Sequence, residues 1–401
     1  MDSTRPQRAR KLRIAAFVTI ELEHGRGILR GIAHHFRNRP EVTVLRYGQT
    51  QGYELEALQG MRLDGIIAKV GTARDVGVFG QLGLPVINIS GQMNPRDVPQ
   101  VNSDDRRVGA IALDHFFRRG YRNVAYCGNA RHAASRLRLA GFEAAAKAAG
   151  VAGEVPALFI PKGDQNTPYA DSVRVALDSW LRSLPRPVGV FAFTDRVALE
   201  LAEACGREGL RIPEEVALLG VGDDLTRIDF APVALSSIRL NTERIGTLAA
   251  EALDRWIATG MRPGDVMVPP KKIITRRSSD HYAVADDGVS QALDYLRENL
   301  ANPIYVDEVA VAAGVSRRAL ELRFRRALGT SVNSEALRMK MECAAELLED
   351  PGTQVTEVAF KLGFGSLKDF SRAFSRYYSH SPREHRARSI EGKGGALTAQ
   401  R

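Results

Sequence analysis

Two segments near the carboxyl end of the chain repeat one pattern, and this repeat constrains the fold more than any other feature. Each copy begins with a short helical stretch that ends at a glycine, and a second helical stretch then opens at a serine. The first copy has these features at residues 307–313, Gly314 and Ser316, and the second has them at residues 356–362, Gly363 and Ser366. Glycine ends a helix because it adopts a positive φ at little cost, and a serine side chain accepts hydrogen bonds from the first amides of the next helix. Both turns are therefore encoded locally.

Apolar residues recur at helical spacing in both copies. They are Val309, Ala310, Leu320 and Phe324 in the first copy, and Val358, Ala359, Phe370 and Phe374 in the second. We interpret them as the core of each helix pair rather than as aromatic side chains that stack on bases. The sequence thus predicts an all-α domain with two helix-turn-helix motifs, whose second helices enter a DNA major groove.

Residues 334–349 favour one continuous linking helix between the two motifs. Strong helix formers are combined there with apolar residues at helical spacing, namely Leu337, Met341, Ala344, Ala345 and Leu348. At about 1.5 Å per residue this helix spans roughly 24 Å. With its flanking turns it sets the two second helices on the order of 34 Å apart, the spacing of adjacent major grooves.

Positive charge is concentrated at the two predicted motifs. Seven basic and two acidic side chains lie between Ser316 and Lys340, and Arg338 and Lys340 are among the basic ones. A merely solvated surface mixes the two signs. Clustered positive charge suits contacts to DNA phosphates, and the net charge of +9 points the same way, with solubility alone as the alternative.

The second motif carries a specific run of residues with fixed offsets: Gly363-Phe364, Ser366, Phe370, Phe374, and Ser381-Pro382 followed by Arg383 and Arg386. With this run, the domain resembles the AraC family of bacterial transcription regulators. The resemblance implies double-stranded operator DNA as a partner. It implies DNA contacts from Ser316, Arg317, Arg318, Glu321, Leu322, Arg325 and Arg326 in the first motif, and from Ser366, Leu367, Lys368, Asp369, Arg372 and Arg376 in the second. The resemblance implies that eight of these face the bases, with contact to phosphate or solvent as the alternative for each: Arg317, Arg318, Glu321, Leu322, Leu367, Lys368, Asp369 and Arg372.

Residues 13–278 alternate short β-rich runs with amphipathic helical stretches. This order predicts an α/β fold of parallel, doubly wound sheets with helices on both faces, and the length of the segment favours two lobes. Ligands of such folds lie beyond the carboxyl ends of the strands. The charged and polar residues that follow the predicted strands are Glu21, Glu23, Lys69, Asp104, Asp105, Thr194, Asp195, Asp223 and Asp224. Acidic groups and an arginine between two lobes suit a monosaccharide or polyol, although Asp104 and Asp195 could instead only cap helices.

Three segments, residues 101–128, 136–150 and 212–224, are similar to the effector-binding core shared by LacI-type repressors and periplasmic sugar-binding proteins. The resemblance implies that Arg138 and Asp195 bind sugar hydroxyls. Together with the strand ends, it gives an effector-binding set of Glu21, Lys69, Arg138, Thr194, Asp195 and Asp223. Gly222 replaces the family's first acidic residue after the last core strand, which leaves the identity of the sugar open.

A core of this type followed by an AraC-type reader is similar, from end to end, to the xylose-regulator group of bacterial transcription factors. The resemblance implies a homodimeric, sugar-responsive activator of a pentose catabolic operon, with a xylose-like monosaccharide as effector and RNA polymerase as a partner. A repressor, or a regulator that responds to another sugar or polyol, is the alternative.

The predicted organisation is a basic tail (1–12), the α/β effector-binding domain (13–278), a linker (279–290), the double helix-turn-helix domain (291–388) and a flexible tail (389–401). The odd number of dispersed cysteines, Cys127, Cys205 and Cys343, argues against a disulfide framework. No apolar run reaches the roughly 20 residues of a membrane span, and the first residues do not form a signal peptide. We therefore expect a cytoplasmic protein without membrane contact.

An enzyme is the competing class. Gly25, Gly27 and Gly31 faintly resemble a dinucleotide-binding loop, but the spacing G-x-G-x-x-x-G is one residue too long. The sequence contains neither a G-x-S-x-G elbow nor an H-E-x-x-H helix, and His34 and His35 fit the surface of a helix. We expect no enzymatic activity, no cofactor and no metal site.

Overall fold

The computed structural model describes residues 11–48, 52–93, 95–151, 153–161, 169–283, 286–348 and 352–391. The chain divides into two compact units. The amino-terminal unit comprises Met1–Phe117 and Arg122–His281, and the carboxyl-terminal unit comprises Arg118–Tyr121 and Tyr282–Arg401. The first unit is α/β and the second is all-helical among the described residues, which confirms the predicted fold class.

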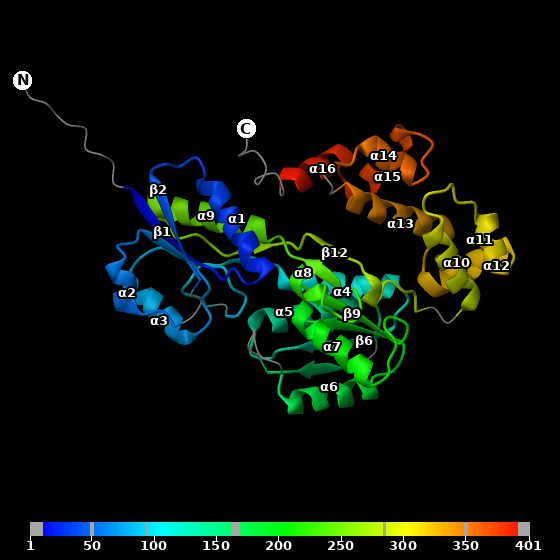
Figure 1. Cartoon of the computed structure of the whole chain (residues 1–401), viewed down its shortest axis with the longest axis horizontal. Coiled ribbons are helices and arrows are strands. Elements are labelled where there is room, and N and C mark those ends of the chain that lie inside the picture. Colours follow the sequence, from blue (N-terminus) through cyan, green and yellow to red (C-terminus); the bar gives the residue numbers. More distant parts are fainter. Residues whose placement is uncertain are drawn as a thin grey trace, which may run out of the picture. The chain divides into compact units, whose positions relative to one another are not determined.

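Lobe 1 of the amino-terminal unit is built on a parallel sheet with the strand order β2-β1-β3-β4 (Figure 1). Its elements are β1 (Leu12–Phe17), β2 (Val42–Tyr47), β3 (Gly65–Ala68), β4 (Val86–Asn88), α1 (Glu23–Phe36), α2 (Leu55–Gly60), α3 (Ala73–Leu82) and α9 (Thr242–Thr259). Side chains alternate along β1, so Ile14 and Ala16 pack with α1 and α9 while Ala15 and Phe17 pack with α2 and α3. Helices therefore cover both faces of this sheet.

Lobe 2 is built on a sheet with the order β12-β10-β9-β8-β6-β7, which is parallel except for β12. Its elements are β6 (Asn123–Gly128), β7 (Ala157–Phe159), β8 (Val188–Ala192), β9 (Val216–Val221), β10 (Ser236–Arg239), β12 (Lys272–Ile274), α4 (Asp105–Arg118), α5 (Ala133–Ala148), α6 (Asp171–Ser183), α7 (Asp195–Arg207), α8 (Leu225–Ile228) and η1 (Arg277–Ser279). Helices α6 and α7 form one core with the sheet. On the other face, the rings of Phe116 in α4 and Phe191 in β8 both contact the ring of Phe142 in α5.

The described chain passes between the two lobes at three connections, residues 103–105, 239–242 and 268–272. Strand β5 (Val101–Ser103) pairs with β11 (Val266–Val268), and a bridge between Asn88 and Gln100 joins this pair to β4. Residues 103–105 and 268–272 therefore leave lobe 1 at the carboxyl ends of β5 and β11, and residues 239–242 leave lobe 2 at the carboxyl end of β10.

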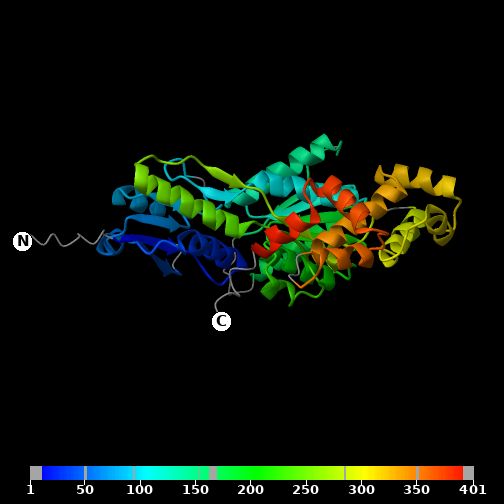
Figure 2. The same cartoon turned by 90° about the horizontal axis from the view of Figure 1, so that it is seen from above.

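Gly27 and Gly31 lie where α1 runs along α9 (Figure 1, Figure 2). A Cβ atom at Gly27 would lie 2.0 Å from Oγ1 of Thr242, and one at Gly31 would lie 2.0 Å from the carbonyl oxygen of Glu243. Both glycines thus permit the close approach of two helices. This packing accounts for their spacing without a dinucleotide.

The carboxyl-terminal unit has two helical cores joined by α13. Its helices are α10 (Asp287–Glu298), α11 (Val306–Ala312), α12 (Arg317–Leu328), α13 (Val332–Leu347), α14 (Val355–Lys361), α15 (Leu367–Tyr378) and α16 (Pro382–Glu391). The eight apolar residues predicted as core are buried, four in each helix pair. Gly314 and Gly363 have φ angles of 63° and 69°, as the predicted helix stops require. Ala336 of α13 belongs to the first core and Met341 to the second, so this helix links both.

Candidate functional site

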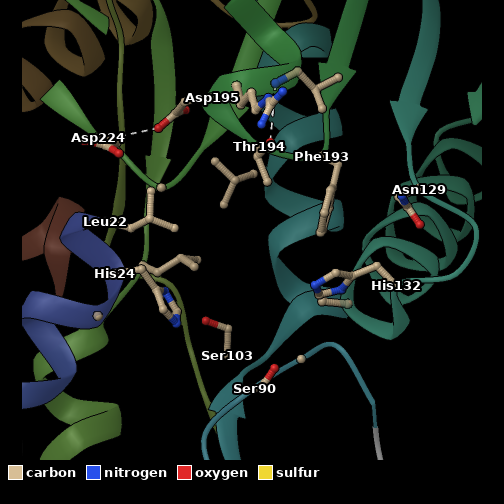
Figure 3. Close-up of a pocket in the computed structure, with 18 of the residues that line it drawn as sticks. Leu22, His24, Ser90, Ser103, Asn129, His132, Phe193, Thr194, Asp195 and Asp224 are labelled. Carbon is tan, nitrogen blue, oxygen red and sulfur yellow. Dashed lines mark hydrogen bonds between the residues drawn. The ribbon is translucent and has the colours of Figure 1, made fainter. Parts of the chain in front are cut away.

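A cavity of about 280 Å³ lies between the two lobes. It is lined at the carboxyl ends of β1, β3 and β4 in lobe 1 and of β6, β8 and β9 in lobe 2. In Figure 3, Leu22 and His24 face His132 and Phe193 across this space. Pockets for drug-sized ligands have volumes of about 300 Å³ or more, so this cavity can hold a molecule smaller than a typical drug.

Arg138 reaches the cavity because α4 and α5 cross closely. Cβ atoms at Gly109 and Gly141 would each lie 2.0 Å from a carbonyl oxygen of the opposite helix. Arg138 of α5 therefore donates from Nε to Oδ1 of Asp105 at 2.8 Å and from Nη1 to the carbonyl of Phe193 at 2.6 Å. Nη2 has no hydrogen-bond partner among the described residues. One edge of a buried guanidinium is thus available to a ligand.

Asp195 begins α7 and is buried at the lobe 2 wall of the cavity (Figure 3). Its Oδ1 accepts a hydrogen bond from Ser237 at 2.5 Å, and its Oδ2 accepts one from the amide of Asp224 at 2.9 Å. Burial raises the pKa of this carboxyl to about 6, although both hydrogen bonds oppose the shift. Asp195 is therefore mostly ionised at neutral pH and can accept further hydrogen bonds from hydroxyl groups.

Gly222 and Asp223 follow β9, and Gly222 stands where the resembling family has its first acidic residue. Gly222 has a φ of +132°, and a Cβ there would lie 3.1 Å from Oδ2 of Asp195, so an acidic side chain would add strain and repulsion. The carboxylate of Asp223 accepts bonds from Nε of Arg239 and Nη2 of Arg276, each at 2.7 Å. Asp224, and not Asp223, is the acidic residue that lines the cavity after β9.

His24 and Ser103 complete the wall on the side of lobe 1 and the connections (Figure 3). Burial, together with the nearby charges of Arg138 and Lys69, lowers the pKa of His24 to about 4. The imidazole is therefore neutral at pH 7, with one donor and one acceptor nitrogen. The buried hydroxyl of Ser103 has no hydrogen-bond partner among the described residues.

The second candidate site lies on α12 of the carboxyl-terminal unit. Ser316 caps this helix by accepting a hydrogen bond from the amide of Ala319 at 3.3 Å. Leu320 and Phe324 point into the core. The opposite side is exposed and carries Arg317, Arg318, Glu321, Leu322, Arg325 and Arg326. Arg317 forms ion pairs with Asp307 at 3.0 Å and with Glu321 at 3.3 Å.

Helix α15 repeats this arrangement. Ser366 accepts a hydrogen bond from the amide of Asp369 at 3.1 Å and donates one to Oδ2 of Asp369 at 2.7 Å. Leu367 is half-buried, and the exposed side carries Lys368, Asp369, Arg372 and Arg376. Both helices thus present a cationic surface that is anchored by apolar residues on the opposite side.

Family models match both units of the chain. A model of periplasmic binding protein-like domains matches residues 113–279, and a model of helix-turn-helix domains matches residues 309–388. The chain joins a periplasmic binding protein-like domain to a helix-turn-helix domain. These matches point to a transcription regulator rather than to an enzyme.

Known proteins with similar sequences include xylose operon regulatory proteins. That of Escherichia coli (strain K12) is 33% identical over 212 residues, which are 52% of this chain and 54% of that protein, so the chain spans about half the length of this relative. That of Haemophilus influenzae is 25% identical over 345 residues, which are 83% of this chain and 87% of that protein. The solved structure of the xylose-binding transcription activator xylR shares the fold, with a TM-score of 0.60 and 23% identity over 94% of this chain and 98% of that one.

The periplasmic binding protein-like domain brings four of the six predicted effector residues to the cavity: Lys69, Arg138, Thr194 and Asp195. Thr194 also caps α7 by accepting a hydrogen bond from the amide of Val197 at 3.4 Å. Glu21 is exposed and Asp223 is ion-paired, and neither lines the cavity. His24, Ser103 and Phe193 line it without having been predicted. Phe193 and Ser103 carried a signal, because they stand directly before Thr194 and Asp104, which follow predicted strands.

The helix-turn-helix domain corrects the interpretation of two basic residues. The sequence groups Arg338 and Lys340 with the DNA-facing charge, and this interpretation is wrong because both are buried in α13. Arg338 donates to Glu335 at 2.6 Å and to Glu342 at 2.7 Å. Nζ of Lys340 donates to the carbonyls of Asn302 and Leu362, both at 2.8 Å. These two cations therefore hold the helices together and are not available to phosphates.

No helix within the described ranges is both long and apolar enough to cross a bilayer.

Proposed function

We propose that the protein is a sugar-responsive, DNA-binding transcription regulator. The observation that carries the proposal is the joining, in one chain, of an interlobe cavity lined in part by charged side chains with a helix-turn-helix domain whose capped helices expose basic side chains. The lobes would close around the effector, and the closed form would change how the chain binds operator DNA. We expect a homodimer in the cytoplasm, and contact with RNA polymerase if the protein is an activator.

The cavity suits a small neutral polyol. The side chains that line it include four cationic groups, Lys69, Arg138, Arg196 and Arg227, and four acidic groups, Glu23, Asp105, Asp195 and Asp224. A charge-balanced wall favours an uncharged ligand over a sugar acid. The donor edge of Arg138 and the acceptor oxygens of Asp195 match sugar hydroxyls, and the ring of Phe193 offers a surface to the apolar face of a pyranose. The names of the relatives support xylose as the first candidate.

The helix-turn-helix domain suits two successive major grooves. Helix α13 has 16 residues and therefore spans roughly 24 Å, and it connects the cores that carry α12 and α15. Major grooves on one side of DNA recur about every 34 Å, so each exposed helix can enter one groove. We propose DNA contacts from all thirteen residues predicted from the sequence, with Ser316 and Ser366 also acting as helix caps.

The effector proposal is tested by a thermal-shift screen of the intact protein against D-xylose, L-arabinose, D-ribose, D-glucose, xylitol and gluconate. A ligand that binds only the folded state raises Tm. We expect a neutral sugar, D-xylose first, to raise Tm, and Arg138→Ala to abolish the shift. Arg136→Ala is the matched control, because Arg136 lies exposed on the same helix and does not line the cavity.

The DNA proposal is tested by selecting duplexes from a random pool with the intact protein, with and without D-xylose. Enrichment of one sequence family supports a sequence-specific reader. If no duplex is enriched in either condition, the DNA-binding proposal fails. If duplexes are enriched but no sugar or polyol shifts Tm, the sugar-sensing proposal fails alone.

A further inference from the structure

The two exposed helices of the reader correspond residue by residue. Helices α12 and α15 both contain 12 residues, and each begins at a serine cap. Each ends at a residue in the left-handed region, Gly329 with φ 71° and Ser379 with φ 60°. The buried residues also coincide, because Leu320 and Phe324 occupy the positions of Phe370 and Phe374. Position 322 in the first helix is therefore equivalent to position 372 in the second.

This position differs in chemistry between two otherwise similar surfaces. Leu322 is 70% exposed, and Arg372 is also exposed. A basic residue stands one turn before each of them and another one turn after, at Arg318 and Arg326 in α12 and at Lys368 and Arg376 in α15. An apolar side chain thus occupies the middle of one cationic row, and a guanidinium occupies the middle of the other.

A single exposed leucine is common on protein surfaces and by itself indicates nothing. The place of Leu322 gives it meaning, because the flanking cations would anchor the helix to phosphates and leave the central side chain over the base edges. In the major groove, an apolar side chain is matched by the 5-methyl group of thymine, whereas arginine is matched by O6 and N7 of guanine.

We propose that Leu322 reads a thymine methyl group in one half-site and that Arg372 reads a guanine at the equivalent position of the other. The inference rests on the proposed DNA-binding function. The difference between Leu322 and Arg372 would make the two half-sites chemically different, so that a single chain binds its operator in one orientation only.

The thymine contact is tested with the duplex selected by the intact protein. Each thymine of the site is replaced singly by uracil, which removes the methyl group and leaves every hydrogen bond of the base pair intact. We expect one replacement in one half-site to weaken binding about three- to fivefold, as loss of one buried methyl group implies. Leu322→Ala should weaken binding to the thymine duplex by a similar factor and should be insensitive to the same replacement.

Two further variants complete the test. Val311→Ala changes another exposed apolar residue, which lies on α11 outside the row, and should keep the full response to uracil. Arg372→Leu should lose about 5- to 150-fold in affinity when the matching base is guanine, with a smaller loss when it is not. Because Leu322, Val311 and Arg372 are exposed, unchanged Tm values should accompany all three changes.

The outcomes separate this inference from the proposed function. If the protein selects no duplex, both fail. If it selects a duplex but no uracil replacement weakens binding, or if Leu322→Ala responds to uracil as the unmodified protein does, the thymine reading is overturned and DNA binding stands.

Discussion

Arg138 in the interlobe cavity and Arg338 in α13 are both buried and both paired with a carboxylate, yet their surroundings differ. Arg338 uses its whole guanidinium, donating to both oxygens of Glu335, to Glu342 and to the hydroxyl of Tyr282. Burial opposes its charge, but the hydrogen bonds to Glu335 and the charge of Glu342 outweigh burial and hold the pKa of Arg338 above its usual range. Arg138, which lines the cavity, donates from Nε and Nη1, and its Nη2 has no hydrogen-bond partner among the described residues. The guanidinium of Arg338 is thus taken up by contacts within the fold, whereas that of Arg138 keeps a donor for the proposed ligand.

The largest effect is expected from Arg338→Ala. Removing one partner of a buried ion pair costs about 3–5 kcal/mol, because Glu335 would remain buried and unpaired. Calorimetry of the intact protein should show the unfolding transition of the helix-turn-helix domain at a much lower temperature, with D-xylose binding retained. Arg326→Ala, an exposed change in the same domain, is the control. A loss in Arg338→Ala no larger than that of the control would contradict a structural role.

Arg138→Lys should instead affect binding more than folding. Lysine keeps a positive charge beside Asp105 but has no planar fork, so it cannot satisfy Asp105, the Phe193 carbonyl and a ligand together. Loss of a hydrogen bond from a charged group costs about 1.5–3 kcal/mol, which corresponds to at least a tenfold weaker sugar affinity by titration calorimetry. An unchanged affinity would mean that the open edge of Arg138 does not touch the sugar.

The raised pKa of Asp195 predicts a pH dependence of the cavity. The folded-state value of about 6 lies above the ordinary 3.8, so the folded protein holds this proton more tightly, and the resulting stability is present at low pH and lost as the pH rises toward 6. If a sugar hydroxyl donates to the ionised carboxylate, affinity should be up to about tenfold weaker at pH 5 than at pH 7.5. Asp195→Asn should remove this pH dependence; if the variant retains it, another group is responsible.

The smallest effect on stability is expected from Arg317→Ala. Its ion pairs with Asp307 and Glu321 are exposed, and such pairs contribute little to folding. Tm should stay unchanged while the affinity for the selected duplex falls. A clear drop in Tm would show that Arg317 stabilises the fold as Arg338 does. It would contradict the expectation that exposed cations contribute less to stability than buried ones.

Local sequence patterns predicted the helices discussed above, but they did not predict which short strands pair over long distances in the chain. The glycine stops, the serine caps and the apolar spacing of α12 and α15 are determined by neighbouring residues, and the structure has them where the sequence places them. Strands β5, β11 and β12 contain three residues each and pair with strands far along the chain. Runs of that length carry no periodicity of their own.

The candidate sites were predictable to a similar degree. Strand ends located Lys69, Thr194 and Asp195, while Arg138 came from family resemblance, because its place depends on the crossing of α4 with α5. His24 reaches the cavity only through the arrangement of the two lobes. The sequence did not indicate that Arg338 and Lys340 are buried. A basic residue on an amphipathic helix gives the same sequence pattern whether it binds DNA phosphates or buried carboxylates and carbonyls.

The coupling of sugar binding to DNA binding is tested most directly by measuring the Kd of the intact protein for D-xylose by titration calorimetry, with and without a saturating amount of the selected duplex. Linkage requires that DNA change the sugar affinity by the same factor by which sugar changes the DNA affinity, and couplings of this kind are about 5- to 150-fold. We predict tighter D-xylose binding in the presence of the duplex, with the reciprocal experiment giving an equal factor. Equal sugar affinities with and without DNA would contradict the account.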